Sequence, residues 1–152
     1  MDKKKLLKIV ILLLNAGVLL STYLYITKIL NTSVICPTNG CEIVDSSPYS
    51  YLLGLPVSLW GMVYYLGMSV VALVWFKKES EIVKKLFFLG TIWGILFTVY
   101  LRFVEIFKIG AFCVWCWGSV VIIVALAYYS WRLYKADSQG YNSSDENKKT
   151  SN

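Results

Sequence analysis

Residues 111–134 read AFCVWCWGSVVIIVALAYYSWRLY, an apolar stretch whose single charged residue, Arg132, lies near its end. A transmembrane helix needs about 20 predominantly apolar residues, so this stretch can cross a bilayer. Two cysteines, Cys113 and Cys116, lie at its start. In a helix they are about one turn apart, which lets them form a disulfide or act together as a dithiol. The stretch therefore predicts a membrane helix with a redox-capable pair of thiols at one end.

The rest of the chain is similarly apolar. Hydrophobic residues make up 57% of its 152 residues and charged residues 16%, and the mean hydropathy is +0.60. A soluble domain of this size normally carries more charge. The first apolar run is longer than the core of a cleavable signal peptide, so we expect it to be retained. We predict an all-α membrane protein, a bundle of four transmembrane helices at about residues 6–27, 56–76, 86–107 and 111–134.

The uneven distribution of lysine and arginine predicts how the chain is oriented in the membrane. The N-terminus, the 77–85 loop and the C-terminal tail are basic, whereas residues 31–54 contain no Lys or Arg. By the positive-inside rule, both termini are cytoplasmic. Four spans then place residues 31–54 and 108–112 on the periplasmic or extracellular side of the cell (inner) membrane. All four cysteines fall on that side, where disulfides persist.

Two polar segments remain outside the spans. The outer one, residues 31–54, is predicted to carry a short amphipathic helix from Glu42 to about Leu53, which lies on the membrane surface and is broken near Pro48. The other, residues 136–152, is rich in Ser, Asn and Lys and is predicted to be a disordered cytoplasmic tail. The membrane domain is therefore expected to occupy residues 1–135.

Composition also argues against several functions. The net charge of +6 comes mainly from residues at the ends of apolar runs, so it indicates topology and not nucleic-acid binding. The chain contains no His, which removes imidazole as a general base, a haem ligand or the usual zinc ligand.

Near the end of the third span, Arg102, Glu105 and Lys108 are interpreted as an interfacial i,i+3 ion pair with a snorkelling lysine, or as a docking point for a partner. Gly90 and Gly94 in the same span favour close helix packing.

The other two cysteines, Cys36 and Cys41, are separated by residues that favour a turn, Pro37 and Asn39-Gly40. Fully extended, they would be roughly 17 Å apart, whereas a disulfide needs Cα atoms within about 7 Å. Two structural disulfides are one interpretation of the four cysteines, but a disulfide within one helical turn closes a short loop and stabilises little. A zinc site of four thiolates is another, but it would lack acidic or His residues to support its ligands.

Two redox pairs on one face of the membrane favour a relay. Electrons would pass by thiol–disulfide exchange from an outside donor to the loop pair and then to the helix pair. The chain has no Gly-rich dinucleotide motif and no predicted metal site, so a quinone of the ubiquinone or menaquinone type fits the location and the two-electron stoichiometry. The aromatic residues beside the pair, Phe112, Trp115 and Trp117, are either neighbours of the quinone or interfacial anchors. The alternative is a non-catalytic four-helix membrane scaffold with structural disulfides.

A set of residues follows a specific order along the chain, in which the loop pair of cysteines comes before the second span and the CxxC comes at the start of the fourth span. The set comprises Cys36-x4-Cys41, Ser47, Gly54-Leu-Pro56, Trp60-Gly61, Tyr64 and Gly110-Ala-Phe-Cys113-Val-Trp-Cys116. In this order the chain, from about residue 8 to residue 134, resembles a bacterial member of the vitamin K epoxide reductase family. The unrelated DsbB family also joins thiols to quinone across four helices, but its CxxC is in the first outer loop.

The resemblance implies a role for each cysteine. Cys116 would be the thiol beside the quinone, and Cys113 its disulfide partner. Cys41 would attack Cys113 to form the interloop intermediate, and Cys36 would exchange with the partner protein. Ser47 matches the hydroxyl residue that would hydrogen-bond a quinone oxygen; its other interpretation is a capping or turn serine.

Two departures from the family bear on the substrate. Val57, a candidate quinone contact, stands where vertebrate enzymes carry an Asn, and Val120 stands where they carry a Tyr. Both favour plain quinone reduction over reduction of vitamin K epoxide. Many bacterial relatives carry a fused thioredoxin-like domain after the fourth helix, and the tail is too short for one. The expected partner is therefore a separate DsbA-like thioredoxin-fold protein outside the membrane.

Overall fold

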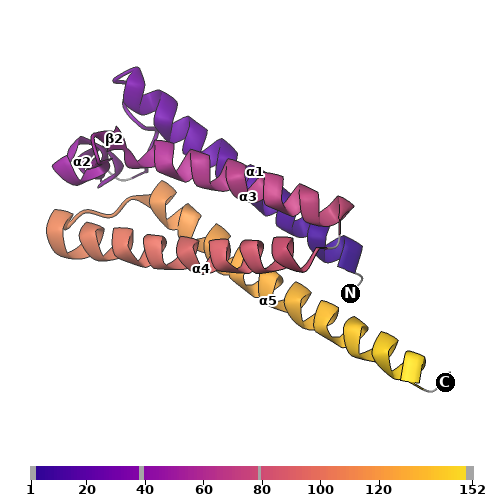
Figure 1. The fold of residues 1–152 in the computed structure, drawn as a ribbon. Coiled ribbons are helices and arrows are strands. Elements are labelled where there is room, and N and C mark those ends of the chain that lie inside the picture. Colours follow the sequence, from indigo (N-terminus) through magenta and orange to yellow (C-terminus); the bar gives the residue numbers. More distant parts are fainter. Residues whose placement is uncertain (1–2, 38–39, 79, 150–152) are drawn as a thin grey trace.

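Four long helices dominate the computed structural model (Figure 1). It describes the backbone of residues 3–37, 40–78 and 80–149, and side chains of these segments between residues 4 and 135. The long helices are α1 (Lys3–Ile29), α3 (Val57–Lys77), α4 (Glu81–Val104) and α5 (Val114–Lys149). All four are long and apolar enough to cross a membrane, so the predicted four-helix membrane bundle is confirmed. The helix α4 begins at Glu81, five residues before the predicted start of the third span, and Glu81 and Lys84 form an ion pair within its first turn.

The helices pack as a bundle in which α1 contacts α3 and α5, and α4 contacts α3 and α5. Their buried faces form one core, to which α1 contributes Val10 and Leu14, α3 contributes Ala72 and Trp75, and α4 contributes Phe87. Large apolar side chains also cover the outside, including Leu12 at 71% and Leu19 at 72% exposed. A helix that is apolar all round is expected where lipid replaces water at its surface.

Small residues bring α3 and α4 close together, as the sequence predicts. A Cβ at Gly90 would meet the sulfur of Met68 at 2.5 Å, and one at Gly94 would overlap the hydroxyl of Tyr64. That hydroxyl donates a hydrogen bond to the carbonyl oxygen of Gly90, at 3.0 Å. The two glycines therefore seat two α3 side chains directly against the backbone of α4.

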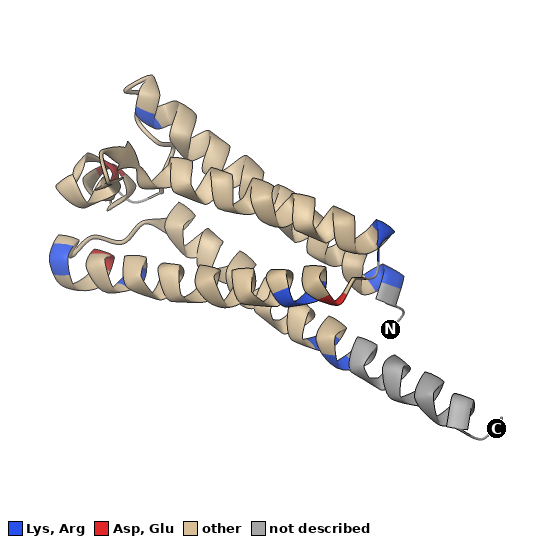
Figure 2. Cartoon of the chain, in the orientation of Figure 1, with Lys and Arg blue, Asp and Glu red and all other residues tan. Residues whose placement is uncertain are grey.

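Basic residues gather at one end of the bundle (Figure 2). That end holds the start of α1, the connection from α3 to α4 and the last described side chains of α5, with Lys4, Lys5, Lys77, Lys78, Lys85 and Lys135 among its charges. At the opposite end, Lys28 and Arg102 form ion pairs with Asp45 and Glu105. The charge asymmetry read from the sequence is thus an asymmetry between the two ends of the folded bundle.

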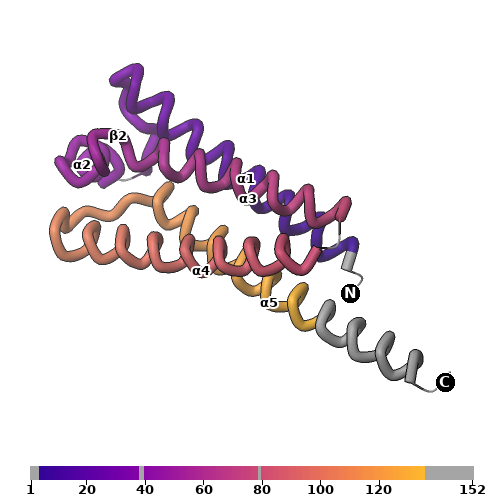
Figure 3. Tube along the Cα trace, in the orientation of Figure 1, coloured from indigo at the N-terminus to yellow at the C-terminus, as the bar shows by residue number. Residues whose placement is uncertain are grey.

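The described residues between α1 and α3, called the outer segment after their predicted side of the membrane, fold at the end of the bundle opposite the start of α1, beside the connection from α4 to α5 (Figure 3). It contains the short helix α2 (Gly40–Ser46), the 3-10 turn η1 (Pro48–Ser50), and a hairpin of β1 (Tyr51–Leu52) and β2 (Leu55–Pro56). The predicted short helix is present, but it ends before Pro48 and does not continue to Leu53. The hairpin turn uses Leu53 and Gly54, both with positive φ, as a two-residue turn of the I′ type requires.

The last helix, α5, runs to Lys149. Its backbone is helical through residues 136–149 of the predicted tail, and the disorder of that tail stays a prediction. Residues 150–152 of that predicted tail lie outside the described residues.

Candidate functional site

The outer segment carries a disulfide between Cys36 and Cys41, whose Cα atoms are 6.2 Å apart. Cys41 lies in the first turn of α2 and is buried, whereas Cys36 ends an extended stretch and is half-buried. The pair is thus within bonding distance, in agreement with the turn-favouring residue types of the sequence between them.

The second pair, Cys113 and Cys116, is present as free thiols at the start of α5. Helical structure begins at Val114, so Cys113 is the N-cap residue: its carbonyl accepts from Trp117 N–H at 3.1 Å. Its sulfur accepts a hydrogen bond from the backbone N–H of Cys116 at 3.3 Å. A serine at an N-cap accepts from the third helical residue in the same way. The fold therefore points the first amides of α5 at the sulfur of Cys113.

This placement favours the thiolate of Cys113. A hydrogen bond from the Cys116 thiol, the backbone N–H of Cys116 and the positive charge of Arg102 together lower the pKa of Cys113 from 9.0 to about 7, although burial opposes the shift. A thiolate at a helix N-terminus is further favoured by the helix dipole. Cys113 is thus a stronger acid than an ordinary cysteine thiol.

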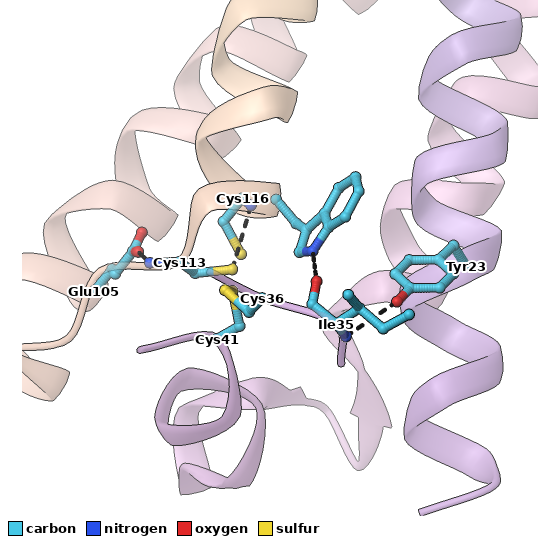
Figure 4. The surroundings of a disulfide bond; sticks show 8 residues. Tyr23, Ile35, Cys36, Cys41, Glu105, Cys113 and Cys116 are labelled. Atoms are coloured by element: carbon cyan, nitrogen blue, oxygen red, sulfur yellow. Dashed lines mark hydrogen bonds between the residues drawn. A yellow bond between two sulfur atoms is a disulfide. The ribbon is translucent and has the colours of Figure 1, made fainter. Parts of the chain in front are cut away.

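The two pairs face one another (Figure 4). Cys41, Cys113 and Cys116 line the same cavity. Close approach of the two backbones depends on Gly40, where a Cβ would overlap the carbonyl oxygen of Phe112. Because Gly40 precedes Cys41 and Phe112 precedes Cys113, this contact sets the loop disulfide directly against the helix dithiol.

The chain just before Cys36 is fixed from both sides (Figure 4). The backbone N–H of Ile35 donates to the hydroxyl of Tyr23 at 3.2 Å, and its carbonyl accepts from the indole N–H of Trp115 at 2.8 Å. The rings of Tyr23 and Trp115 also contact each other, with centroids 5.4 Å apart. Two spans, α1 and α5, therefore hold the disulfide-bearing segment in place.

The cavity beneath the cysteines has a volume of about 540 Å³, in the range of small-molecule binding sites. Its walls are mainly apolar and come from all four long helices, with the outer segment as a cover; they include Val57, Trp60, Trp93, Phe97, Leu101 and Ile123. Polar groups are few and include the side chains of Asp45 and Ser50. A flat apolar ring with oxygen atoms at its edge is compatible with such walls.

The structure brings some of the predicted quinone contacts to this cavity and leaves others outside it. Cys116 and Val57 are among the lining residues. Ser47 is not, because its hydroxyl turns back to donate to the carbonyl of Val44 at 2.7 Å, the turn role that the sequence left open. Phe112 is exposed and stacks on Trp117, and Trp115 is engaged with Ile35. Two other hydroxyl residues of the outer segment, Tyr49 and Ser50, do line the cavity.

Lys28 ties this cover to the bundle. From the end of α1 its ammonium pairs with the carboxylate of Asp45 at 3.4 Å, donates to the Asp45 carbonyl, and donates to the hydroxyl of Ser50 at 2.9 Å. It also lies over the ring of Tyr51, 4.7 Å from its centroid. The side chain of Lys28 is only 10% exposed, and its buried contacts hold the outer segment against the end of α1.

The i,i+3 ion pair that the sequence suggested, Arg102 with Glu105, is present, and its side chains are largely buried. Both residues line the cavity, and Glu105 is 2% exposed. The carboxylate of Glu105 accepts a hydrogen bond from the backbone N–H of Cys113 at 2.7 Å. A carboxylate inside a predicted span is itself a signal of function, and Glu105 was detectable in the sequence on that ground.

Metal ligation finds no support at the described residues, where no group of three or more His, Cys, Asp and Glu side chains is arranged to hold an ion. One cysteine pair is already bonded to itself.

Four membrane spans and two facing cysteine pairs define a class, the multi-pass membrane proteins of thiol–disulfide chemistry. Within that class, the chain belongs to the vitamin K epoxide reductase family, whose family model matches residues 8–131. It is accordingly a membrane thiol oxidoreductase. Members of the family generally use a quinone and work with thioredoxin-like proteins.

Proposed function

We propose that the protein is a thiol:quinone oxidoreductase that reoxidises a DsbA-like thioredoxin-fold protein outside the membrane and so supports disulfide bond formation. The observation that carries this proposal is the meeting of a disulfide, Cys36–Cys41, and a dithiol, Cys113 and Cys116, at one apolar cavity inside the bundle. A scaffold with structural disulfides has no use for free thiols beside such a cavity.

Electrons enter at the loop pair. The reduced partner's thiolate attacks Cys36, and the mixed disulfide resolves to give the oxidised partner and the reduced Cys36 and Cys41. The thiolate of Cys41 then attacks Cys113 of the Cys113–Cys116 disulfide, and Cys116 leaves as a thiolate. Cys36 next attacks Cys41, so that the Cys36–Cys41 disulfide is restored and Cys113 leaves. Two electrons and two protons have moved from the partner to Cys113 and Cys116.

The dithiol that results is the state seen in the structure, with the loop pair oxidised. A quinone in the cavity supplies an acceptor for two electrons and two protons, and reoxidation leaves a Cys113–Cys116 disulfide. The residues that would contact it are Cys116, Val57 and the apolar wall, with Ser50 a more suitable hydrogen-bond donor than Ser47 because Ser50 lines the cavity. The aromatic neighbours Phe112 and Trp115 would instead support the cysteine-bearing segments.

The charge asymmetry of the bundle supports an orientation in the membrane. With the basic end in the cytoplasm, the cysteines face the periplasmic or extracellular space, where a secreted thioredoxin-fold partner meets them. Direction then depends on potentials, since roughly 30 mV corresponds to a tenfold change in the equilibrium constant of a two-electron couple. A quinone pool more oxidising than the partner draws electrons inward.

The proposal is tested by quinone absorbance in proteoliposomes supplied with a reduced thioredoxin-fold protein. We expect turnover in the wild type and none in Cys113→Ala or Cys116→Ala. Cys36→Ala should lose transfer from the protein donor but still allow exchange between Cys41 and Cys113. Full turnover in Cys116→Ala would show that Cys116 is not the quinone-side thiol, and normal oxidation of the partner in Cys36→Ala would remove Cys36 from the relay.

A further inference from the structure

Two buried charges lie beside the dithiol without a part in the exchange steps. Arg102, in the last turn of α4, and Glu105, the first residue of η2 (Glu105–Ile109), form an ion pair whose side chains are 16% and 3% exposed. Removing such a pair from water costs desolvation energy that the pairing only partly returns. Charged side chains within membrane spans are correspondingly rare and are associated with function. Stability alone does not account for this pair.

The geometry directs both residues at the start of α5. One carboxylate oxygen of Glu105 accepts the backbone N–H of Cys113 at 2.7 Å, and the other pairs with Arg102. The guanidinium lies over the ring of Trp117 in the first turn of α5, 5.9 Å from its centroid. The pair therefore bridges the end of one span and the beginning of the next.

The connection between these spans makes the bridge possible. η2 is a π-turn, closed by a hydrogen bond from Gly110 N–H to the carbonyl of Glu105 at 2.9 Å. Gly110 then adopts a positive φ of 66°, which reverses the chain toward Cys113. Such π-turns occur frequently at functional sites. Here the turn keeps Glu105 buried within reach of the Cys113 amide.

We propose that Arg102 and Glu105 are a positioning pair for the dithiol, in which Glu105 fixes the backbone of Cys113 and the two opposite charges set how strongly the Cys113–Cys116 pair oxidises. This inference deepens the proposed function and rests on it only for the direction of electron flow. Neither residue needs to touch the quinone for it to hold.

The two charges act on Cys113 with opposite sign. The positive charge of Arg102 helps to lower the pKa of Cys113, while a carboxylate at Glu105 disfavours a thiolate beside it. A lower thiol pKa makes Cys113 a better leaving group when Cys36 closes on Cys41. It also stabilises the reduced pair, which makes the disulfide a stronger oxidant.

Other groups near Cys113 do not duplicate the role of Arg102. Of the described residues that line the cavity, Arg102 is the one cation. Cys116 of α5 faces Cys113 directly, and Asp45 of α2 and Tyr64 and Tyr65 of α3 share the cavity. The carboxylate of Asp45 is already paired with Lys28.

The test uses the full chain in nanodiscs, fully reduced, with no quinone or partner protein present. The rate of alkylation at Cys113 is followed by mass mapping from pH 5 to pH 10, and the Cys113–Cys116 pair is equilibrated with a glutathione redox buffer. The variants are Arg102→Gln, Arg102→Lys, Glu105→Gln, which keeps an amide oxygen for the Cys113 N–H, and the double variant Arg102→Gln, Glu105→Gln. The matched control is Glu81→Gln, which removes the acid of the other i,i+3 pair on α4, at its far end.

We expect Arg102→Gln to raise the alkylation midpoint by about one pH unit or more and to make the disulfide less oxidising. Arg102→Lys keeps the positive charge, so its alkylation midpoint should return most of the way to the wild-type value. Glu105→Gln should lower the midpoint, the double variant should lie between the two single variants, and Glu81→Gln should match the wild type.

Opposite shifts cannot result from a general loosening of the fold, which would move both variants the same way. Shifts of the same sign, or an unchanged midpoint in either single variant, would overturn the inference. Because no quinone is involved, failure of quinone turnover in the wild type would contradict the proposed function and leave this result standing.

Discussion

At the scale of single residues, the contact between the two cysteine pairs depends on the missing side chain of Gly40. The atom that a Cβ would overlap is the backbone carbonyl of Phe112, which cannot move without moving Cys113. A displacement of about 1 Å can slow a positioned reaction on the order of 100-fold. Gly40 is therefore a requirement for exchange that does not itself take part in it.

We predict that Gly40→Ala slows transfer from the reduced Cys36 and Cys41 to the Cys113–Cys116 disulfide by up to about 100-fold. Rapid-quench alkylation with mass mapping measures this step in a single turnover. The matched control is Gly67→Ala on α3, where a Cβ would have no heavy atom within 4 Å. Wild-type exchange in Gly40→Ala would show that the loop tolerates the displacement.

The two serines of the outer segment give a second residue-scale prediction. Ser50 lines the cavity, whereas the hydroxyl of Ser47 is bonded to Val44. A lost neutral hydrogen bond costs about 0.5–1.5 kcal/mol, so Ser50→Ala should raise KM for the quinone roughly 3- to 10-fold, with Ser47→Ala close to the wild type. Steady-state kinetics over a quinone concentration series provide the measurement. The reverse order would support the role of Ser47 implied by the family resemblance.

At the scale of elements, the cover of the cavity is held by one residue from α1. Lys28 reaches α2 and η1 through Asp45 and Ser50, and no other described lysine makes these contacts. Its ion pair includes a carboxylate that is 40% exposed, so water screens part of the attraction. We therefore assign the contacts of Lys28 with Asp45 and Ser50 a combined stabilisation of about 1 kcal/mol.

We predict that Lys28→Met lets the outer segment open more often. Amide hydrogen exchange of residues 40–56 should become on the order of fivefold faster, which corresponds to a loss of about 1 kcal/mol. Lys108→Met removes an exposed lysine at the same end of the bundle and serves as the control. Exchange that is equally fast in both variants would mean that Lys28 is not the residue that holds the cover.

Elements differ in how far the sequence predicts them. The spans follow from apolar length, because bilayer thickness fixes how many residues a helix needs. The hairpin at Tyr51–Pro56 could not be predicted, since two-residue strands are too short to show an alternating pattern. The position of Glu105 was missed for another reason: spacing shows that it pairs with Arg102, but only the π-turn η2 determines that the pair faces the dithiol and not the lipid headgroups.

The cysteine site divides in the same way. Turn residues between Cys36 and Cys41 and the CxxC at the start of the fourth span are local signals, and they predict two pairs on one side of the membrane. The approach of the pairs is a tertiary feature, created where Gly40 meets Phe112. Ser50 likewise reaches the cavity only because the chain turns through η1 after Ser47.

At the scale of the whole molecule, the basic end of the bundle predicts its orientation. Ser46, the last residue of α2, and Lys78, which directly follows α3, are both exposed, and these two points lie at opposite ends of the bundle. In intact cells, a membrane-impermeant maleimide should label Ser46→Cys, and should label Lys78→Cys only after the membrane is opened. Mass mapping separates these sites from the native cysteines. The opposite labelling pattern would place the relay on the cytoplasmic side.

The whole molecule then acts as one path from an outside thiol to a lipid-soluble acceptor, and the response of all four cysteines to quinone tests that path most directly. The protein is fully reduced in proteoliposomes, freed of reductant, given quinone and mapped by alkylation. We predict that Cys113 and Cys116 are oxidised first and Cys36 and Cys41 after them. In the variant Cys113→Ala, Cys116→Ala the loop pair should stay reduced. The relay would be contradicted if quinone oxidised the loop cysteines in that variant. It would also be contradicted if quinone changed the redox state of none of the four cysteines in the wild type.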